Sequence, residues 1–235
     1  MTHGARTIVL LPGLDGSGVL FRPLVGALPG ELRPQVVSYP GDQPLGYDEL
    51  LIQVLDRLPR NEPFVLLGES FSGPLAVQVG ARRPSGLEAI VLCATFVRCP
   101  LPFGRPGLAP LIRPFPFRLF PLFTRIKSIL GGISSPALRA LSKEALADVR
   151  PEVLAHRVRE VFRVDARQDL VASAVPVLYL RGTRDLVVPA RNLREILRLK
   201  PTVQVARIPA PHLLLQAQPG LAAAAIAGFL ERSVR

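Results

Sequence analysis

Short runs of consecutive apolar residues recur along the chain, and most of them are bounded by proline or glycine. The runs are rich in Val, Ile and Leu and are apolar throughout, which is the pattern of strands that are covered on both faces of a parallel sheet. We expect six such strands, over Thr7–Leu11, Gln35–Tyr39, Phe64–Leu67, Ala89–Cys93, Val175–Leu180 and Val203–Ile208.

Patterns of helical length lie between and after these runs. We expect helices over Ser17–Leu28, Tyr47–Leu58, Pro74–Arg82, Ala190–Leu199 and Leu221–Arg232. The alternation of strand and helix predicts an α/β fold with a doubly wound, mostly parallel sheet of about six strands. No repeat with a period of about 20–50 residues is visible, so the sequence gives no support for a solenoid or a propeller.

Residues 101–167 interrupt this alternation. The first part, from Leu101 to Lys127, contains six prolines, which rule out a long regular helix there. The second part, from Pro136 to Arg163, has apolar residues near helical spacing. Because the strand pattern resumes at Val175, we expect residues 101–167 to form a lid over the strand ends, inserted into a core of residues 1–100 and 168–235.

The composition is that of a globular protein. Of the 235 residues, 49% are hydrophobic and 20% are charged, and the mean hydropathy is +0.32, which excludes a largely disordered chain. No apolar run of about 18 residues is uninterrupted, so we expect no transmembrane helix. Cys93 and Cys99 are too few to stabilise this fold through disulfides, and no signal peptide is visible. We therefore expect a cytoplasmic protein with structural cysteines and no metal site.

The chain is strongly basic. Its 29 Lys and Arg residues against 18 Asp and Glu residues give a formal net charge of +11, which favours acidic partners. Between Leu101 and Lys127, Phe and Leu residues are interleaved with five basic residues and no acidic one: Arg105, Arg113, Arg118, Arg125 and Lys127. We expect this lid segment to dock an acidic carrier protein or an anionic membrane surface, or else to form a solvated basic face. We expect no nucleic-acid partner.

The strand expected at Phe64–Leu67 runs through Gly68, Glu69 and Ser70 into a helical pattern. This is the context of a nucleophile elbow, in which a sharp turn between strand and helix lifts a nucleophile above the sheet. The residues that flank such a turn have to be small, and Gly68, Ser72 and Gly73 meet that need. An ordinary turn with Ser70 as the N-cap of the helix is the alternative.

A serine hydroxyl needs a base to become a nucleophile, and the chain has three histidines. His3 lies near the N-terminus, and His156 lies in the helical part of the insertion among polar and charged neighbours. His212 follows the last expected strand on a loop before the final helix. Its imidazole can therefore reach the carboxyl edge of the sheet, and we expect His212 to be the base for Ser70.

The base in turn needs a carboxylate that orients it and stabilises its charged form. Asp185 lies on a loop directly after the penultimate expected strand. Asp165 and Asp169 are rival candidates, but they precede that strand and are expected at the opposite edge of the sheet. The expected set is therefore Ser70, Asp185 and His212, in that order along the chain.

A glycine-rich turn, residues 12–18, follows the first expected strand. Acyl chemistry needs two N–H donors that hold a developing oxyanion. We assign these donors to Leu14 in this turn and to Phe71, the residue after the nucleophile. The turn lacks the lysine of a P-loop and the glycine spacing of a dinucleotide-binding motif, which argues against nucleotide binding.

Four segments resemble the α/β-hydrolase superfamily in order and in context, over nearly the whole chain: Gly13–Gly18, Gly68–Gly73, Gly182–Pro189 and His212. The resemblance implies a Ser70 nucleophile with Asp185 and His212 as partners, no cofactor, and a lid at the insertion. Two features depart from the family pattern, because Pro12-Gly13 stands where His-Gly is common and the first β-hairpin is missing. Serine at the elbow favours acyl chemistry, since an aspartate there would attack epoxides or halides.

The sequence thus predicts a serine hydrolase that cleaves small carboxylic esters with an apolar acyl group through an acyl-enzyme. A thioesterase or an acyltransferase would use the same residues, and the sequence does not separate these reactions. Outside catalysis, the alternative is a membrane- or carrier-binding protein on a hydrolase scaffold.

Overall fold

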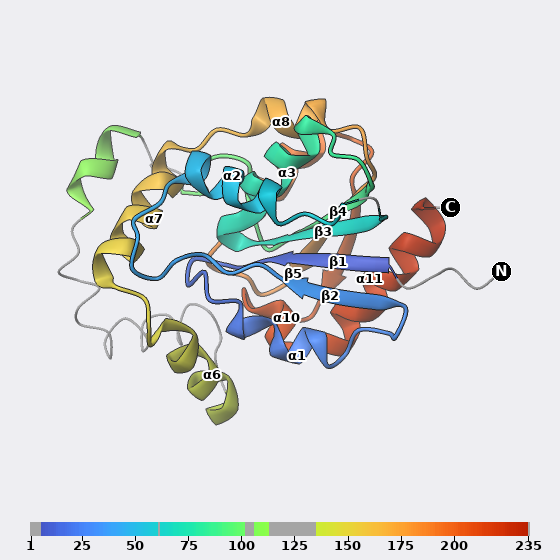
Figure 1. The fold of residues 1–235 in the computed structure, drawn as a ribbon, viewed down its shortest axis with the longest axis horizontal. Helices are drawn as coiled ribbons and strands as arrows, with labels where there is room; N and C mark the ends of the chain where they lie inside the picture. Colours follow the sequence, from blue (N-terminus) through green and yellow to red (C-terminus); the bar gives the residue numbers. More distant parts are fainter. Residues whose placement is uncertain (1–5, 61, 102–105, 113–134, 235) are drawn as a thin grey trace.

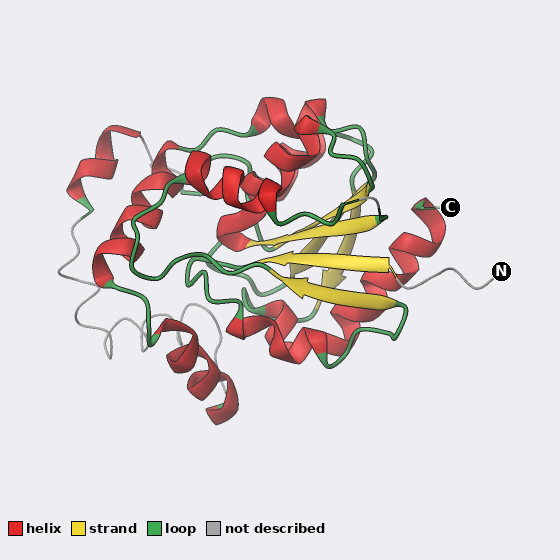
Figure 2. Ribbon diagram, viewed as in Figure 1, coloured by secondary structure: helices red, strands yellow, loops and turns green. Residues whose placement is uncertain are grey.

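A six-stranded sheet forms the centre of the molecule (Figure 2). The computed structural model describes residues 6–60, 62–101, 106–112 and 135–234. The strands pair in the order β2-β1-β3-β4-β5-β6, and all of the pairs are parallel. Their bounds are β1 Arg6–Leu11, β2 Leu32–Val36, β3 Phe64–Glu69, β4 Leu87–Cys93, β5 Val177–Gly182 and β6 Gln204–Ile208. The expected α/β fold with about six strands is confirmed.

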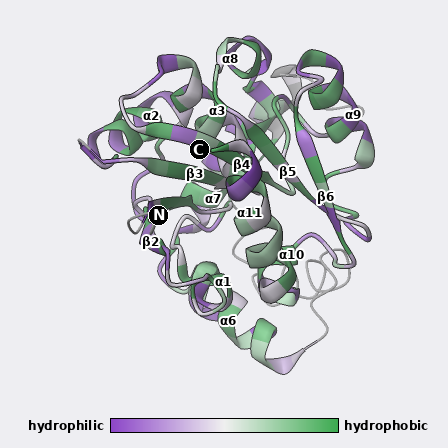
Figure 3. Cartoon of the chain, turned by 90° about the vertical axis from the view of Figure 1, so that its right-hand side faces the viewer, coloured by the Kyte–Doolittle hydropathy of each residue, from purple (hydrophilic) through white to green (hydrophobic). Residues whose placement is uncertain are grey.

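Helices cover both faces of the sheet (Figures 1 and 3). One face carries α2 (Tyr47–Asp56), α3 (Gly73–Arg82), α8 (Arg167–Ala172) and α9 (Ala190–Leu199). The other face carries α1 (Arg22–Val25), α10 (Leu214–Ala217) and α11 (Pro219–Ser233). Each face has its own hydrophobic core, and this arrangement explains why the strands are apolar at every position rather than at alternate ones.

The central strands show this double burial directly. Val9 of β1 and Leu66 of β3 point into the core under α2 and α3, whereas Ile8 and Val65 point into the core under α11. All four side chains are fully buried. Each contributes roughly 1.5–3 kcal/mol of hydrophobic stabilisation.

The strand order reverses direction between β1 and β3. The chain passes from β1 to β2 on one side and then returns to β3 on the other side of β1. In open parallel sheets, ligands bind in the crevice at the carboxyl ends of the strands at such a reversal. The loop after β1 and the turn after β3 both lie at this reversal, at the edge of the sheet where ligands bind in such folds.

Two strands are displaced from the expected apolar runs. β2 spans Leu32–Val36 and not 35–39, and as an edge strand it tolerates Pro34. Val37 and Tyr39 lie beyond the end of that strand but are buried. The apolar pattern therefore extends past the strand, and the expected range was too far along the chain. β5 begins at Val177 and not at 175, because the preceding Pro176 has no N–H for the ladder.

The helix expected over 17–28 is much shorter than its apolar pattern. A 3₁₀ turn, η1 (Val19–Phe21), leads into α1, which has only four residues. Gly18 precedes the turn with φ +76°, Pro23 stands in the first turn of α1, and Gly26 ends it. Leu20, Phe21 and Leu24 are buried, and the spacing of these three residues in the sequence resembles that of a longer helix.

The insertion contributes η3 (Pro106–Leu111), α6 (Pro136–Leu146) and α7 (Pro151–Arg163) to the described structure. The helical pattern over 136–163 is two helices, because Pro151 starts a new one. Both helices lie beyond the carboxyl ends of the strands (Figure 1). The base of the insertion is closed by an antiparallel bridge between Arg98 and Asp165 and by the Ala166 N–H, which donates to the Val97 carbonyl at 2.7 Å.

Several expectations for the insertion remain predictions. The five basic residues at 105, 113, 118, 125 and 127 lie outside the described residues. The division into a core and a lid at residues 101 and 167 is likewise a proposal. Among the helices that the structure describes, none is long and apolar enough to cross a membrane.

Candidate active site

Ser70 occupies a sharp turn between β3 and α3. Its φ of +50° is in the left-handed region, which costs free energy for any residue other than glycine. The turn is closely packed on both sides: a Cβ on Gly68 would lie 2.6 Å from the Ser72 carbonyl oxygen, and a Cβ on Gly73 would lie 2.0 Å from the Thr95 hydroxyl oxygen. The small residues that the sequence places at 68 and 73 are therefore required by the geometry of this turn.

The structure brings Ser70, His212 and Asp185 together from three separate loops. The distance from Ser70 Oγ to His212 Nε2 is 3.0 Å, and the distance from His212 Nδ1 to Asp185 Oδ2 is also 3.0 Å. His212 and Asp185 are buried, while Ser70 is half-buried. With the proton on Nδ1, the imidazole donates to Asp185 and its Nε2 accepts from the Ser70 hydroxyl.

Asp185 is held as a buried carboxylate. Its Oδ1 accepts hydrogen bonds from the N–H groups of Val187 at 2.8 Å and Val188 at 3.0 Å. Burial by itself would raise the pKa of Asp185, but the hydrogen bond and charge of His212, together with these N–H groups, lower the pKa below its ordinary value. Arg181, also buried, donates to the Val188 carbonyl at 2.6 Å and lies 3.4 Å from Asp185 Oδ2. The carboxylate therefore stays ionised beside His212.

The rival residues lie elsewhere. Asp165 pairs with Arg167 at 2.5 Å at the base of the insertion, and Asp169 lies in the first turn of α8. His156 lies on α7, half-buried, and His3 falls outside the described residues. Within the part of the chain that the structure describes, neither rival aspartate bonds to His212.

The turn after β1, residues 12–18, lies directly beside Ser70, and we call it the oxyanion loop. A Cβ on Gly13 would be 4.0 Å from the Ser70 Cβ. The Leu14 N–H donates to no acceptor among the described residues. Phe71 is buried, and its ring stacks on Tyr47 with 4.7 Å between the ring centroids. The oxyanion loop and Phe71 are thus both next to Ser70, and the role of Leu14 and Phe71 as oxyanion donors remains a prediction.

One hydrogen-bond network joins the elbow to the oxyanion loop, and the sequence reasoning did not find it. The Ser72 hydroxyl donates to the Pro12 carbonyl in a very short hydrogen bond and also contacts the Tyr39 hydroxyl at 2.7 Å. Ser72 stands at a position where glycine is usual in the elbow motif, and Pro12 stands where the family commonly has histidine. The two departures occur together because the Ser72 hydroxyl holds a loop that lacks the histidine side chain. Their joint occurrence was the signal in the sequence that could have revealed this hydrogen bond.

A second network of hydrogen bonds holds the turn through the carbonyl groups of Ser70 and Phe71. The Thr95 hydroxyl donates to the Ser70 carbonyl in a very short hydrogen bond, and the Tyr47 hydroxyl donates to the Phe71 carbonyl at 2.9 Å. Tyr179 donates to the Thr95 carbonyl at 2.7 Å. These buried contacts satisfy the carbonyl groups of the strained turn and hold Ser70 in place.

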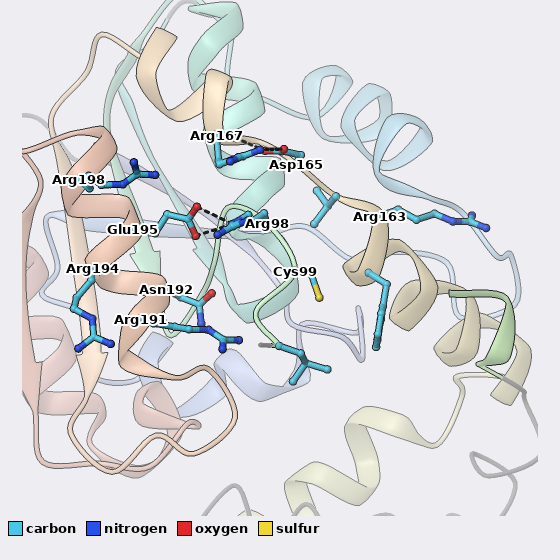
Figure 4. Close-up of a pocket in the computed structure, with 13 residues that line it drawn as sticks. Arg98, Cys99, Arg163, Asp165, Arg167, Arg191, Asn192, Arg194, Glu195 and Arg198 are labelled. Carbon is cyan, nitrogen blue, oxygen red and sulfur yellow. Dashed lines mark hydrogen bonds and ion pairs between the residues drawn. The ribbon is translucent and has the colours of Figure 1, made fainter. Parts of the chain in front are cut away.

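An arginine-lined cavity of about 590 Å³ lies at the same edge of the sheet (Figure 4). It is bordered by α9, by the segment after β4 and by the end of α7, and we call it the arginine groove. Its arginines are Arg98, Arg163, Arg167, Arg191, Arg194 and Arg198. Two acidic residues of the groove are already paired, Glu195 with Arg98 at 2.7 Å and Asp165 with Arg167. Arg194 and Arg198 are exposed and have no ion pair within the described ranges.

Cys93 and Cys99 are free thiols. Cys93 is buried in the core at the end of β4, and burial raises the pKa of its thiol. No group of three or more His, Cys, Asp or Glu residues that could hold a metal ion occurs in the described ranges.

A parallel sheet with a nucleophile elbow, a histidine and a carboxylate at its carboxyl edge defines the architecture of a hydrolase. Residues 8–225 match the model of the alpha/beta hydrolase family, and the chain belongs to that family. The expected membership of the superfamily is thereby confirmed.

Curated relatives are distant. A pimeloyl-[acyl-carrier protein] methyl ester esterase of Xanthomonas oryzae pv. oryzae is 28% identical over 88% of this chain and 87% of its own length. The polyketide synthase ThaQ of Burkholderia thailandensis is also 28% identical, over 97% of this chain, but the chain spans only 12% of that protein.

Solved structures of the same fold are also distant in sequence. The bromoperoxidase of Bacillus anthracis superposes with a TM-score of 0.81 over 97% of this chain and 93% of its own, at 20% identity. At this identity the likeness shows the fold alone.

Proposed function

We propose that this hydrolase is a serine esterase that cleaves carboxylic esters with an apolar acyl group through a covalent acyl-enzyme. The observation that carries the proposal is the continuous hydrogen-bonded chain from Ser70 through His212 to Asp185, with both heavy-atom distances at 3.0 Å. These are the distances that a nucleophile, its base and an orienting acid require.

In the first half of the reaction, His212 Nε2 takes the proton of the Ser70 hydroxyl as Oγ attacks the ester carbonyl carbon. The carbonyl π electrons move to the oxygen, where the N–H groups of Leu14 and Phe71 hold the negative charge. The tetrahedral intermediate collapses, the bond to the leaving oxygen breaks, and that oxygen takes the proton from His212. Asp185 stabilises the imidazolium while it carries the proton.

In the second half, water replaces the alcohol. His212 takes a proton from water, the hydroxide oxygen attacks the acyl carbon, and the same N–H groups hold the oxyanion. Collapse releases the carboxylic acid and returns the proton to Ser70. The cycle uses only side chains and backbone of this chain, and atoms and charge balance at each step.

Apolar contacts on both sides of the site support an apolar acyl group. Leu213, next to His212, packs with Leu20 and with Leu138 of α6. Leu14 packs against Leu154 of α7. The helices of the insertion therefore bring hydrophobic side chains to both the base and the oxyanion loop. The Xanthomonas relative is named as a methyl ester esterase, and this supports ester cleavage as the reaction.

The test is labelling with a fluorophosphonate, which forms a stable adduct only with an activated serine. We expect one adduct per chain, located by peptide mass spectrometry on the segment that contains Ser70, and faster turnover of p-nitrophenyl esters with medium acyl chains than with acetyl. Matched acyl-CoA thioesters and added alcohols test the thioesterase and acyltransferase alternatives. No adduct and no turnover would favour the non-catalytic alternative.

We propose further that the ester is presented by an acidic carrier protein. The name of the Xanthomonas relative supports this, because its substrate is attached to an acyl-carrier protein. The basic residues of the stretch at 101–127 remain candidates for docking but lie outside the described residues. An anionic membrane surface remains the alternative partner. Among the described residues, the arginine groove offers Arg194 and Arg198 to acidic side chains.

Replacing Arg194 and Arg198 together with glutamine is expected to lower kcat/KM on a carrier-bound ester several-fold and to reduce the salt dependence of that rate. A free p-nitrophenyl ester should be cleaved at the wild-type rate. The matched control is Arg232→Gln, which removes an exposed charge from α11 on the other face of the sheet. Equal losses on both substrates would contradict carrier docking at this groove.

A further inference from the structure

Arg157 is a buried cation that reaches from the insertion into the core. It belongs to α7, its exposed fraction is 1%, and its hydrogen-bond acceptors among the described residues are all backbone carbonyls. Nη1 donates to Leu14 at 3.0 Å and to Asp15 at 2.8 Å, and Nη2 donates to Pro40 at 2.8 Å. Two of the three acceptors belong to the oxyanion loop.

The surroundings keep this cation in place despite its burial. Burial lowers the pKa of Arg157, while the negative charge of Asp15 and the proximity of Tyr39 oppose that change. Asp15 is buried, and the guanidinium carbon lies 5.8 Å from the centre of the Tyr39 ring. Arginine stays charged at all ordinary pH values. Burial of a charge costs free energy unless hydrogen bonds compensate for the lost water. The three carbonyl groups therefore hold the guanidinium in place, and the guanidinium in turn restricts the movement of those carbonyl groups.

The oxyanion loop is shaped around the guanidinium. Gly16 has φ +73°, and a Cβ at this position would lie 2.5 Å from Arg157 Nη1. The Gly16 N–H donates to the Gly13 carbonyl at 3.0 Å, which closes the turn that contains Leu14. A side chain at 16 would displace the guanidinium. The glycine is therefore needed for this contact as well as for its backbone conformation.

The contact bears on the oxyanion donor itself. Leu14 carries both the carbonyl that Arg157 holds and the N–H assigned to the oxyanion. The hydrogen bonds from Arg157 to the carbonyl groups of Leu14 and Asp15 restrict rotation of the backbone at Leu14, whose N–H is the expected oxyanion donor. A donor that is already oriented stabilises the transition state without further cost of reorganisation.

We propose that Arg157 is a positioning residue, which couples the inserted helix α7 to the oxyanion loop and holds the Leu14 N–H in its catalytic orientation. The inference rests on the proposed esterase function. It makes the insertion a part of the catalytic apparatus as well as a cover. A merely structural arginine would contribute to folding but not to binding of the oxyanion.

The experiment compares Arg157→Lys with the wild type in kcat, KM and the affinity of a trifluoromethyl ketone whose hydroxyl adduct on serine mimics the oxyanion. Lysine keeps the charge and most of the stem but lacks the planar fork that reaches three carbonyls. We expect kcat and the affinity for the ketone to fall together by about 10- to 100-fold, with KM within about threefold, since loss of a whole donor costs about 10²–10³ in kcat.

Arg159→Met is the matched control. Arg159 is on the same helix and donates twice to the Ile112 carbonyl, at 3.0 and 2.8 Å, so it ties α7 to the insertion rather than to the core. We expect this variant to keep kcat and the affinity for the ketone within about twofold. An equal loss in Arg159→Met would assign the effect to packing of the insertion and overturn the proposal.

A second variant tests the proposal independently if Arg157→Lys folds poorly. Gly16→Ala leaves the cation in the chain but pushes it away from the loop, and we expect the same joint loss of kcat and ketone affinity. Wild-type values of both in either folded Arg157→Lys or folded Gly16→Ala would overturn the proposal. If the wild type itself cleaves no ester, the proposed function fails. If it cleaves esters but folded Arg157→Lys or folded Gly16→Ala matches it, only this inference fails.

Discussion

Replacing Ser70 with alanine is expected to lower kcat for ester hydrolysis by about 10⁴- to 10⁶-fold. On the proposed mechanism, the change removes the atom that forms the covalent intermediate, and His212 then has no hydroxyl to deprotonate. Folding should be retained, because the side chain is half-buried and alanine keeps the small size that the turn requires. Initial rates on a p-nitrophenyl ester measure the loss, and a thermal melt within a few degrees of wild type shows that the fold is intact.

The fluorophosphonate adduct should disappear in the same variant. Ser85→Ala, at an exposed position between α3 and β4, is a suitable control because it removes a hydroxyl far along the chain from the elbow. Near-normal turnover by Ser70→Ala would mean that the elbow assignment is wrong and that another residue carries the acyl group.

Asp185→Asn is expected to lower kcat by about 10⁴-fold, as loss of the acid does in other serine hydrolases. The amide can donate to Nδ1 through its NH₂ group, which favours the tautomer with its proton on Nε2, and that nitrogen then cannot accept the Ser70 proton. The amide also fails to stabilise the imidazolium. Rates on a free p-nitrophenyl ester, measured across pH, check this expectation.

The rival aspartates supply the comparison. Asp165→Asn removes an exposed ion pair with Arg167, and Asp169→Asn changes the first turn of α8. Surface pairs of this kind contribute at most about 1 kcal/mol to stability. Both variants should therefore cleave the free ester at nearly the wild-type rate. Damage comparable to that of Asp185→Asn in either one would move the role of the acid to that residue.

The strands of the core could be predicted because burial on both faces leaves an unmistakable apolar run. Phe64–Leu67 and Ala89–Cys93 lie within β3 and β4, which are buried along nearly their whole length. The apolar signal misplaced β2, because an edge strand is partly exposed and its buried neighbours, Val37 and Tyr39, lie beyond it. Local patterns report burial, and burial is not the same as membership of the sheet.

The residues that meet at the candidate site could be predicted because each follows a strand. Parallel strands place their carboxyl ends at one edge, so chain order after β3, β5 and β6 was enough to bring Ser70, Asp185 and His212 together. Arg157 could not be found in this way. Its contacts with the oxyanion loop span more than 140 residues, and in the sequence it is one of several arginines on a helical pattern.

The closed base of the insertion has a consequence for exchange between relatives. The segment leaves the core at Val97 and Arg98 and returns beside them at Asp165 and Ala166, while the flanking strands β4 and β5 pair directly with each other. A segment that leaves and re-enters the core at adjacent points can be exchanged without breaking a strand of the sheet. On our proposal, a chimera built at this junction keeps a working catalytic apparatus only if the incoming segment delivers a guanidinium to the position that Arg157 fills. The replaceable part of this protein therefore contains one side chain that any incoming segment has to reproduce.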